Sequence, residues 1–122
     1  MNKNIFGEPI ITCSKQPLTG YFRNGCCDTD DSDYGMHTVC VVTTREFLDF
    51  SKSIGNDLST PIPEYGFKGV NPGDKWCLCA LRWKEAYENG CAPKVVLEAT
   101  NEKTLSVIPI NHLIKHALKN VK

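Results

Sequence analysis

Most of the seven cysteines in this 122-residue chain lie near another side chain that can bind a metal. Cys26 and Cys27 are adjacent, His37 and Cys40 are three residues apart, and Cys77 and Cys79 flank a single leucine. Thiolate and imidazole are ligands that zinc prefers in proteins, and four of them close a structural site. The sequence therefore predicts a zinc centre built from a subset of six candidates: Cys26, Cys27, His37, Cys40, Cys77 and Cys79.

Side-chain direction favours some of these candidates over others. On a strand Cys77 and Cys79 project from the same face, whereas His37 and Cys40 project from opposite faces unless a bulge intervenes or the strand begins after His37. We therefore favour Cys40, Cys77 and Cys79 with either Cys26 or Cys27, and His37 as the substitute, in a structural site. Cys13 and Cys91 stand alone among loop residues and are left out.

Two other interpretations of the thiols stay open. The protein could be a small thiol-dependent enzyme or redox sensor that uses Cys26 or Cys27, activated by a nearby cation such as His37 or Arg82. It could also be a ligand-binding or protein-interaction domain whose cysteines are inert, because cysteine is among the most buried residue types. No reaction follows from the sequence, so whether the protein is an enzyme stays open.

The expected compartment and the net charge of the chain limit the kinds of molecule that it could bind. No secretory signal is visible at the start of the sequence, and the longest apolar run is far shorter than the roughly 18 residues of a membrane span, so we expect a cytoplasmic protein. Disulfides are rare there, and seven is an odd number, which makes a disulfide framework the less favoured expectation. The formal charge of zero argues against nucleic acid or a membrane as partner.

Polar groups outside the cysteines suggest a ligand. The stretch Asn56–Gly73 is rich in proline and glycine, and loops of that length are often functional. Asn56 and Asp57 at its start could orient a ligand. Arg82, beside the cysteines, is an anion-binding candidate that could also pair with Glu85 or Asp57. The acidic stretch 28–33 lacks the pattern of a calcium loop and is expected to be solvated.

The elements that must position these residues indicate an α+β domain. The length supports one domain, 1–122, with a short mixed or antiparallel sheet, about three helices and a loop-rich N-terminal third. β-branched residues and turn signals predict strands over 36–43, 75–81 and 94–99, the last of them central, with short strands near 10–13 and 21–23. Apolar spacing and caps predict helices over 44–54, over 83–89 and after Asn111. The first of these helices is expected to begin with a capping box of Thr43 and Glu46.

Four stretches of the chain are similar to a known family: 17–27, 37–40, 55–61 and 72–83. They resemble a bacterial family called domain of unknown function 2237, and the resemblance runs roughly from Gly7 to Leu118. Members often carry Ala-Thr-His-Glu where this chain has Ala99-Thr100-Asn101-Glu102. The resemblance implies that the candidate cysteines, His37 and Arg82 share one neighbourhood, and it implies no activity, substrate or cofactor.

Overall fold

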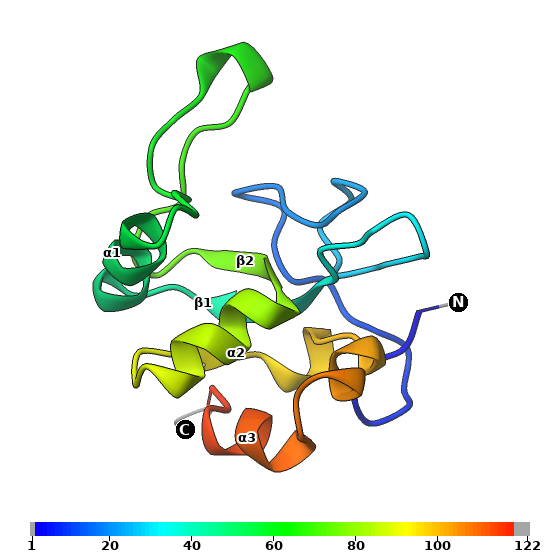
Figure 1. The fold of residues 1–122 in the computed structure, drawn as a ribbon. Helices are drawn as coiled ribbons and strands as arrows, with labels where there is room; N and C mark the ends of the chain where they lie inside the picture. Colours follow the sequence, from blue (N-terminus) through cyan, green and yellow to red (C-terminus); the bar gives the residue numbers. More distant parts are fainter. Residues whose placement is uncertain (1, 119–122) are drawn as a thin grey trace, which may run out of the picture.

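A short antiparallel sheet with helices packed on it forms the fold (Figure 1). The computed structural model describes residues 2–118. Within them the sheet has the order β2-β1-β3, from β1 (His37–Val42), β2 (Lys75–Cys79) and β3 (Lys94–Val95). The α-helices of this part are α1 (Arg45–Ser53), α2 (Ala80–Glu88) and α3 (Ile110–Lys115), and its short 3-10 helices are η1 (Pro63–Tyr65), η2 (Leu97–Ala99) and η3 (Glu102–Ser106). The predicted α+β class is confirmed.

The two faces of the sheet have different neighbours. Val39 and Val41 of β1 belong to the main hydrophobic core, together with the buried residues of α1 and α2. Cys40, between them on the strand, belongs to a second buried cluster that the N-terminal segment covers. Because successive residues of a strand point to opposite faces, this alternation follows from the spacing of Val39, Cys40 and Val41.

Helix α1 agrees closely with the prediction for 44–54. Its buried face includes Phe47 and Leu48, and Gly55 follows with a φ of 93° that glycine adopts without strain. The predicted capping box is wrong, since the Thr44 side chain, not Thr43, accepts the hydrogen bond from the Phe47 amide, at 3.1 Å. The Thr43 hydroxyl instead donates to loop carbonyl groups at 2.8 and 3.0 Å.

The boundary between β2 and α2 differs from the prediction. The strand was expected to reach Leu81 and the helix to begin at Trp83, but β2 ends at Cys79 and α2 begins at Ala80. Ala80, Trp83 and Ala86 are spaced three apart and form the buried face of the helix. A helical start at Ala80 is what carries Trp83 into the core, and it places Cys79 at the N-terminal cap position.

Other boundaries are shorter than expected. The third strand covers 94–95 instead of 94–99, and it lies at the sheet edge, because β1 occupies the centre. The last helix is capped at Pro109 and not at Asn111. The predicted strands near 10–13 and 21–23 do not form, and the N-terminal third is loop apart from isolated bridges. Within the described residues, the helices are all too short or too polar to cross a bilayer.

Candidate functional site

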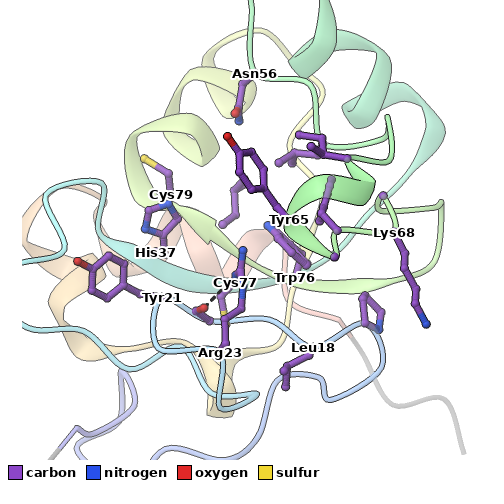
Figure 2. Close-up of a pocket in the computed structure, with 18 of the residues that line it drawn as sticks. Leu18, Tyr21, Arg23, His37, Asn56, Tyr65, Lys68, Trp76, Cys77 and Cys79 are labelled. Carbon is purple, nitrogen blue, oxygen red and sulfur yellow. Dashed lines mark hydrogen bonds between the residues drawn. The ribbon is translucent and has the colours of Figure 1, made fainter.

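A pocket of about 980 Å³ lies where three parts of the chain meet. Its walls are the segment 15–23, which we call the N-terminal wall, the segment 56–69, which we call the arm, and β2 with the first turn of α2. Figure 1 shows the arm extending away from the sheet with η1 at its tip. Figure 2 shows Arg23 of the N-terminal wall extending toward Trp76, and the Tyr65 ring of the arm directed toward Asn56.

The lining combines positive charge with aromatic rings. Its lysine and arginine side chains are Lys15, Arg23, Lys68 and Arg82, against a single acidic group, Asp57, among the described residues that line it. Its aromatic members are Tyr21, Tyr65, Phe67 and Trp76. The guanidinium carbon of Arg23 lies 5.3 Å from the ring centre of Trp76, which is within the range of a cation–π contact. This balance favours a small anion with an apolar portion.

The three predicted ligand-binding residues, Asn56, Asp57 and Arg82, all line this pocket. Arg82 pairs with Glu85, at 3.3 Å, which is one of the two partners expected. The carboxylate of Asp57 is occupied within its own loop, because it accepts hydrogen bonds from the amides of Ser59 and Thr60 at 3.0 and 3.1 Å. Asp57 therefore shapes the arm, and ligand binding by the three residues stays a prediction.

The Asp57 loop predicts a measurable titration. The Thr60 hydroxyl first, then the amides of Ser59 and Thr60, hold the pKa of Asp57 at about 2, below its usual 3.8. Because the folded pKa is lowered, these bonds stabilise the arm above about pH 4 and are lost as the pH falls through 2. Thr60→Val should raise the midpoint toward 4, measured by carboxyl NMR. Ser59→Ala, which removes a weaker contribution, should raise it less; an unchanged midpoint in Thr60→Val would contradict the assignment.

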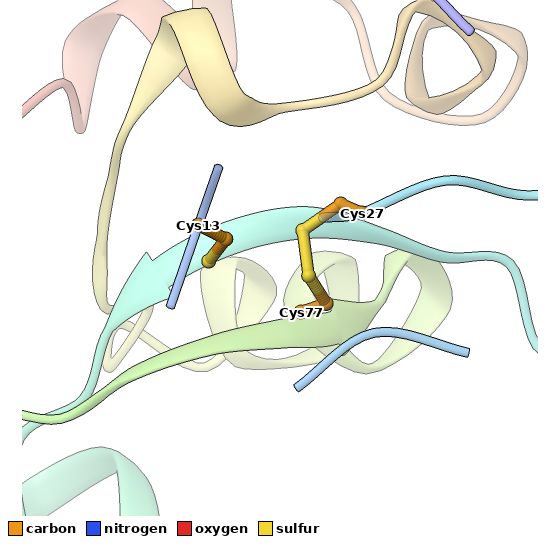
Figure 3. Close-up of side chains that lie close together, drawn as sticks. All are labelled: Cys13, Cys27 and Cys77. Atoms are coloured by element: carbon orange, nitrogen blue, oxygen red, sulfur yellow. A yellow bond between two sulfur atoms is a disulfide. The ribbon is translucent and has the colours of Figure 1, made fainter. Parts of the chain in front are cut away.

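Four buried cysteines meet on the sheet face opposite the main core. Cys40 and Cys77 are register partners on β1 and β2, so their side chains project from the same face. Each is bonded to a cysteine of the N-terminal third, Cys13 to Cys40 and Cys27 to Cys77, with S–S distances of 2.07 Å. Figure 3 shows Cys13 next to the Cys27–Cys77 bond, and the Sγ atoms of these three residues lie within 4.8 Å of one another.

The expectation against a disulfide framework is therefore corrected, since the structure holds two bonded pairs. An odd number of cysteines cannot all be paired, and three of them are free thiols among the described residues: Cys26, Cys79 and Cys91. Burial raises the pKa of the Cys91 thiol, with a smaller contribution from Glu46. A thiol of this kind is a poor nucleophile near neutral pH.

The six predicted metal ligands fall into two groups. Cys27, Cys40 and Cys77 are in the buried cluster, whereas Cys26, His37 and Cys79 lie outside it. Cys26 is adjacent to Cys27 in the sequence, but its Sγ atom lies outside the cluster, 3.9 Å from the Thr12 hydroxyl. Cys79 was expected to lean toward Cys77, but β2 ends there and Cys79 lines the pocket with His37. The single neighbourhood that the family resemblance implied is thus a buried cluster and a pocket that share Cys77, with Cys26 in neither of them.

Sequence reasoning missed Cys13, which is 5% exposed and bonded to Cys40. It was left out because no other cysteine or histidine lies near it in the sequence. Spacing gives no signal for this contact, because the N-terminal segment folds back over the sheet through loops and not through a repeating element.

Asp33 was missed as well. The acidic stretch 28–33 was expected to be solvated, but the Asp33 side chain is fully buried. Its carboxylate accepts hydrogen bonds from the His37 amide at 2.9 Å and the Thr29 hydroxyl at 3.0 Å, and it lies 2.7 Å from His37 Nδ1. The four-residue spacing of Asp33 and His37 was the available signal, although the segment between them is a turn and not a helix.

A shift in the β1 register explains the position of His37. The pairing with β2 slips between His37 and Val39, so His37 lies opposite Cys79 while Cys40 lies opposite Cys77. A bulge was the condition for His37 and Cys40 to share one site. The irregularity is present, but it places His37 opposite Cys79 and not beside Cys40. Figure 2 shows Cys79 beside the His37 ring at the edge of the pocket.

Comparison with known proteins places the chain in a family. A family model described as "Uncharacterized protein conserved in bacteria (DUF2237)" matches residues 3–117. The chain belongs to the DUF2237 family. The match covers the cysteine cluster, the N-terminal wall and the arm, so the whole site lies within the DUF2237 domain. The search of curated proteins found no match.

Proposed function

We propose that this DUF2237 protein is a metal-binding domain whose centre is the buried cysteine cluster. The metal is zinc, and the ligands are the thiolates of Cys13, Cys27, Cys40 and Cys77 in the reduced protein. One observation carries the proposal, namely that the sulfurs of Cys13, Cys27 and Cys77 lie within 4.8 Å of one another, with Cys40 bonded to the first of them. This proposed ligand set differs from the predicted one in including Cys13 and leaving out Cys26, Cys79 and His37.

The donor set fits zinc in number and type. Four thiolates form a closed structural site, and a Zn–S distance near 2.3 Å requires neighbouring sulfurs about 4 Å apart. Sulfurs that lie as far as 4.8 Å apart would have to approach by about 1 Å, and the two pairs bonded at 2.07 Å would have to separate by about 2 Å once the disulfides are opened. Because every metal position would be filled by the protein, the role is structural, holding the N-terminal segment on the sheet.

The metal state requires the two disulfides to be opened. Two molecules of a dithiol reductant would each pass two electrons to one disulfide, giving four protein thiols and two oxidised reductant molecules. Zinc then displaces the thiol protons, which leave to solvent. The cytoplasm, which we propose as the compartment, supplies reductants of this class. With a formal charge of zero, neither nucleic acid nor a membrane is proposed as a partner.

Metal analysis of the reduced protein tests the proposal. The chain is reduced with a phosphine without oxygen, incubated with zinc, desalted, and analysed for bound metal alongside its circular dichroism. We expect about one zinc ion per chain, lost in Cys77→Ser and retained in the control Cys26→Ser, whose thiol lies outside the cluster. A reduced, folded protein that binds no zinc overturns the proposal.

The bonded pairs favour a second candidate, a thiol–disulfide centre that works without metal. The same four cysteines would then exchange between two disulfides and four thiols. A reversible redox titration followed by thiol counting, in protein free of zinc, would support this candidate. Failure of the protein to regain both disulfides on reoxidation would contradict it.

A further inference from the structure

Cys79 occupies a different environment from the four clustered cysteines. It is a free, half-buried thiol that lines the pocket, and it stands at the N-terminal cap of the nine-residue helix α2. No side chain caps this helix end. An anion placed there is stabilised by the positive end of the helix dipole. The position therefore suits both a reacting sulfur and a negatively charged molecule in contact with it.

His37 lies opposite this thiol on the neighbouring strand. It is the register partner of Cys79, and it too lines the pocket. Its Nδ1 lies 2.7 Å from the buried carboxylate of Asp33, so Asp33 orients the ring by engaging Nδ1 and not Nε2. The ring stacks on Tyr21, with 6.0 Å between the ring centres.

The backbone at Gly35 lies close to the same ring. A Cβ atom at this position would come within 2.7 Å of His37 Cε1, so a side chain at residue 35 would force the ring or the turn that carries Asp33 to shift. The orientation of His37 thus depends on a carboxylate, an aromatic ring and a close backbone approach together.

The other side chains that line the pocket indicate which kind of small molecule could bind next to Cys79. Arg82 lies in the first turn of α2, and Arg23 projects from the N-terminal wall across Trp76. Asp57 is the single acidic side chain among the described residues of the lining, and its oxygens already accept hydrogen bonds within the arm. Outside the lining, Glu85 pairs with Arg82 at 3.3 Å. Arginine and aromatic groups around one cavity recognise a small anion with an apolar portion.

We propose that this pocket is a nucleophilic thiol site, separate from the cysteine cluster, for a small anionic electrophile with an apolar portion. Cys79 Sγ forms a bond to the electrophilic carbon of the substrate, and the bond from that carbon to its leaving group breaks with the electron pair on the leaving group. The thiol proton passes to His37 Nε2, and Asp33 positions His37. Arg23 and Arg82 bind the negative charge of the substrate. This site does not depend on whether the cluster binds zinc.

Charged and neutral alkylating reagents test the site. The folded protein, with its disulfides intact, is treated with iodoacetate or iodoacetamide, and each cysteine is followed by peptide mass spectrometry. Cys26, free and half-buried, is the internal control. We expect the iodoacetate-to-iodoacetamide rate ratio to be about tenfold higher at Cys79 than at Cys26, as electrostatic attraction to a charged cleft produces. Equal ratios at the two cysteines overturn the proposal.

Variants separate the roles. Arg23→Gln and Arg82→Gln should lower the iodoacetate rate at Cys79 and leave its iodoacetamide rate unchanged. His37→Gln and Asp33→Asn should lower both rates at Cys79 with their ratio preserved, while Cys26 labels as before. Buried Cys91 reports unfolding, since its labelling rises only if the fold opens. If the histidine or aspartate variant labels Cys79 at the wild-type rate, the assigned roles are wrong.

Discussion

Replacing Cys27 and Cys77 together with alanine should lower the free energy of unfolding by about 4 kcal/mol under non-reducing conditions. The bond joins residues 50 apart in the sequence, and closing a loop of that length restricts the unfolded chain strongly. Both residues are almost completely buried, at 0% and 2% exposure, so the double variant also loses packing in the cluster. Urea denaturation followed by circular dichroism measures the change.

The matched control for this experiment is Cys26→Ala. Cys26 is the immediate neighbour of Cys27, yet it is unbonded and half-buried, so its removal should cost less than about 1 kcal/mol. If the double variant loses no more stability than this control, the bond between Cys27 and Cys77 is absent from the folded protein in solution.

Replacing Trp83 with alanine should cost about 3–5 kcal/mol, measured by the same denaturation. The Trp83 ring is fully buried, stacks on Tyr87 with ring centres 5.5 Å apart, and donates from Nε1 to the Pro93 carbonyl at 3.2 Å. It is the largest residue that α2 buries, so its loss also weakens the anchoring of the helix that begins after Cys79.

Trp83→Phe separates packing from the hydrogen bond. It keeps most of the ring and removes the Nε1 donor, leaving the Pro93 carbonyl unpaired, so a cost of about 1–2 kcal/mol is expected. An alanine variant no less stable than the phenylalanine variant would show that the ring does not hold α2 on the sheet.

Local patterns predicted some parts of the fold well. Helix α1 could be placed to within one residue at each end, because Phe47 and Leu48 supply an apolar face and Gly55 marks the end, although the cap is Thr44 and not the predicted Thr43. The β2–α2 boundary could not be placed, because Ala80 and Leu81 suit either element, and only the burial of Trp83 in the finished core decides between them.

The residues of the site, like the elements of the fold, could be predicted where local patterns mark them and could not where tertiary contacts decide. The sequence pointed to Cys40, Cys77 and the pocket residue Arg82, since strand alternation and charge are local properties. It could not assign Cys13, because neither which of the seven cysteines are bonded nor how they pair can be deduced from their spacing. Asp33 was hidden among exposed acidic neighbours, and its burial depends on a turn that packs only when β1 is in place.

The N-terminal wall lies between two residues that are each bonded to the sheet, Cys13 to β1 and Cys27 to β2. The segment also makes its own contacts with the sheet, because the buried Thr19 hydroxyl accepts a hydrogen bond from the Cys77 amide of β2 at 2.9 Å, and a Cβ atom at Gly20 would clash with the Cys26 carbonyl group. The exposed positions of this stretch that line the pocket, Lys15, Gln16 and Leu18, can therefore change to suit different small molecules while the backbone and the buried Thr19 keep their places.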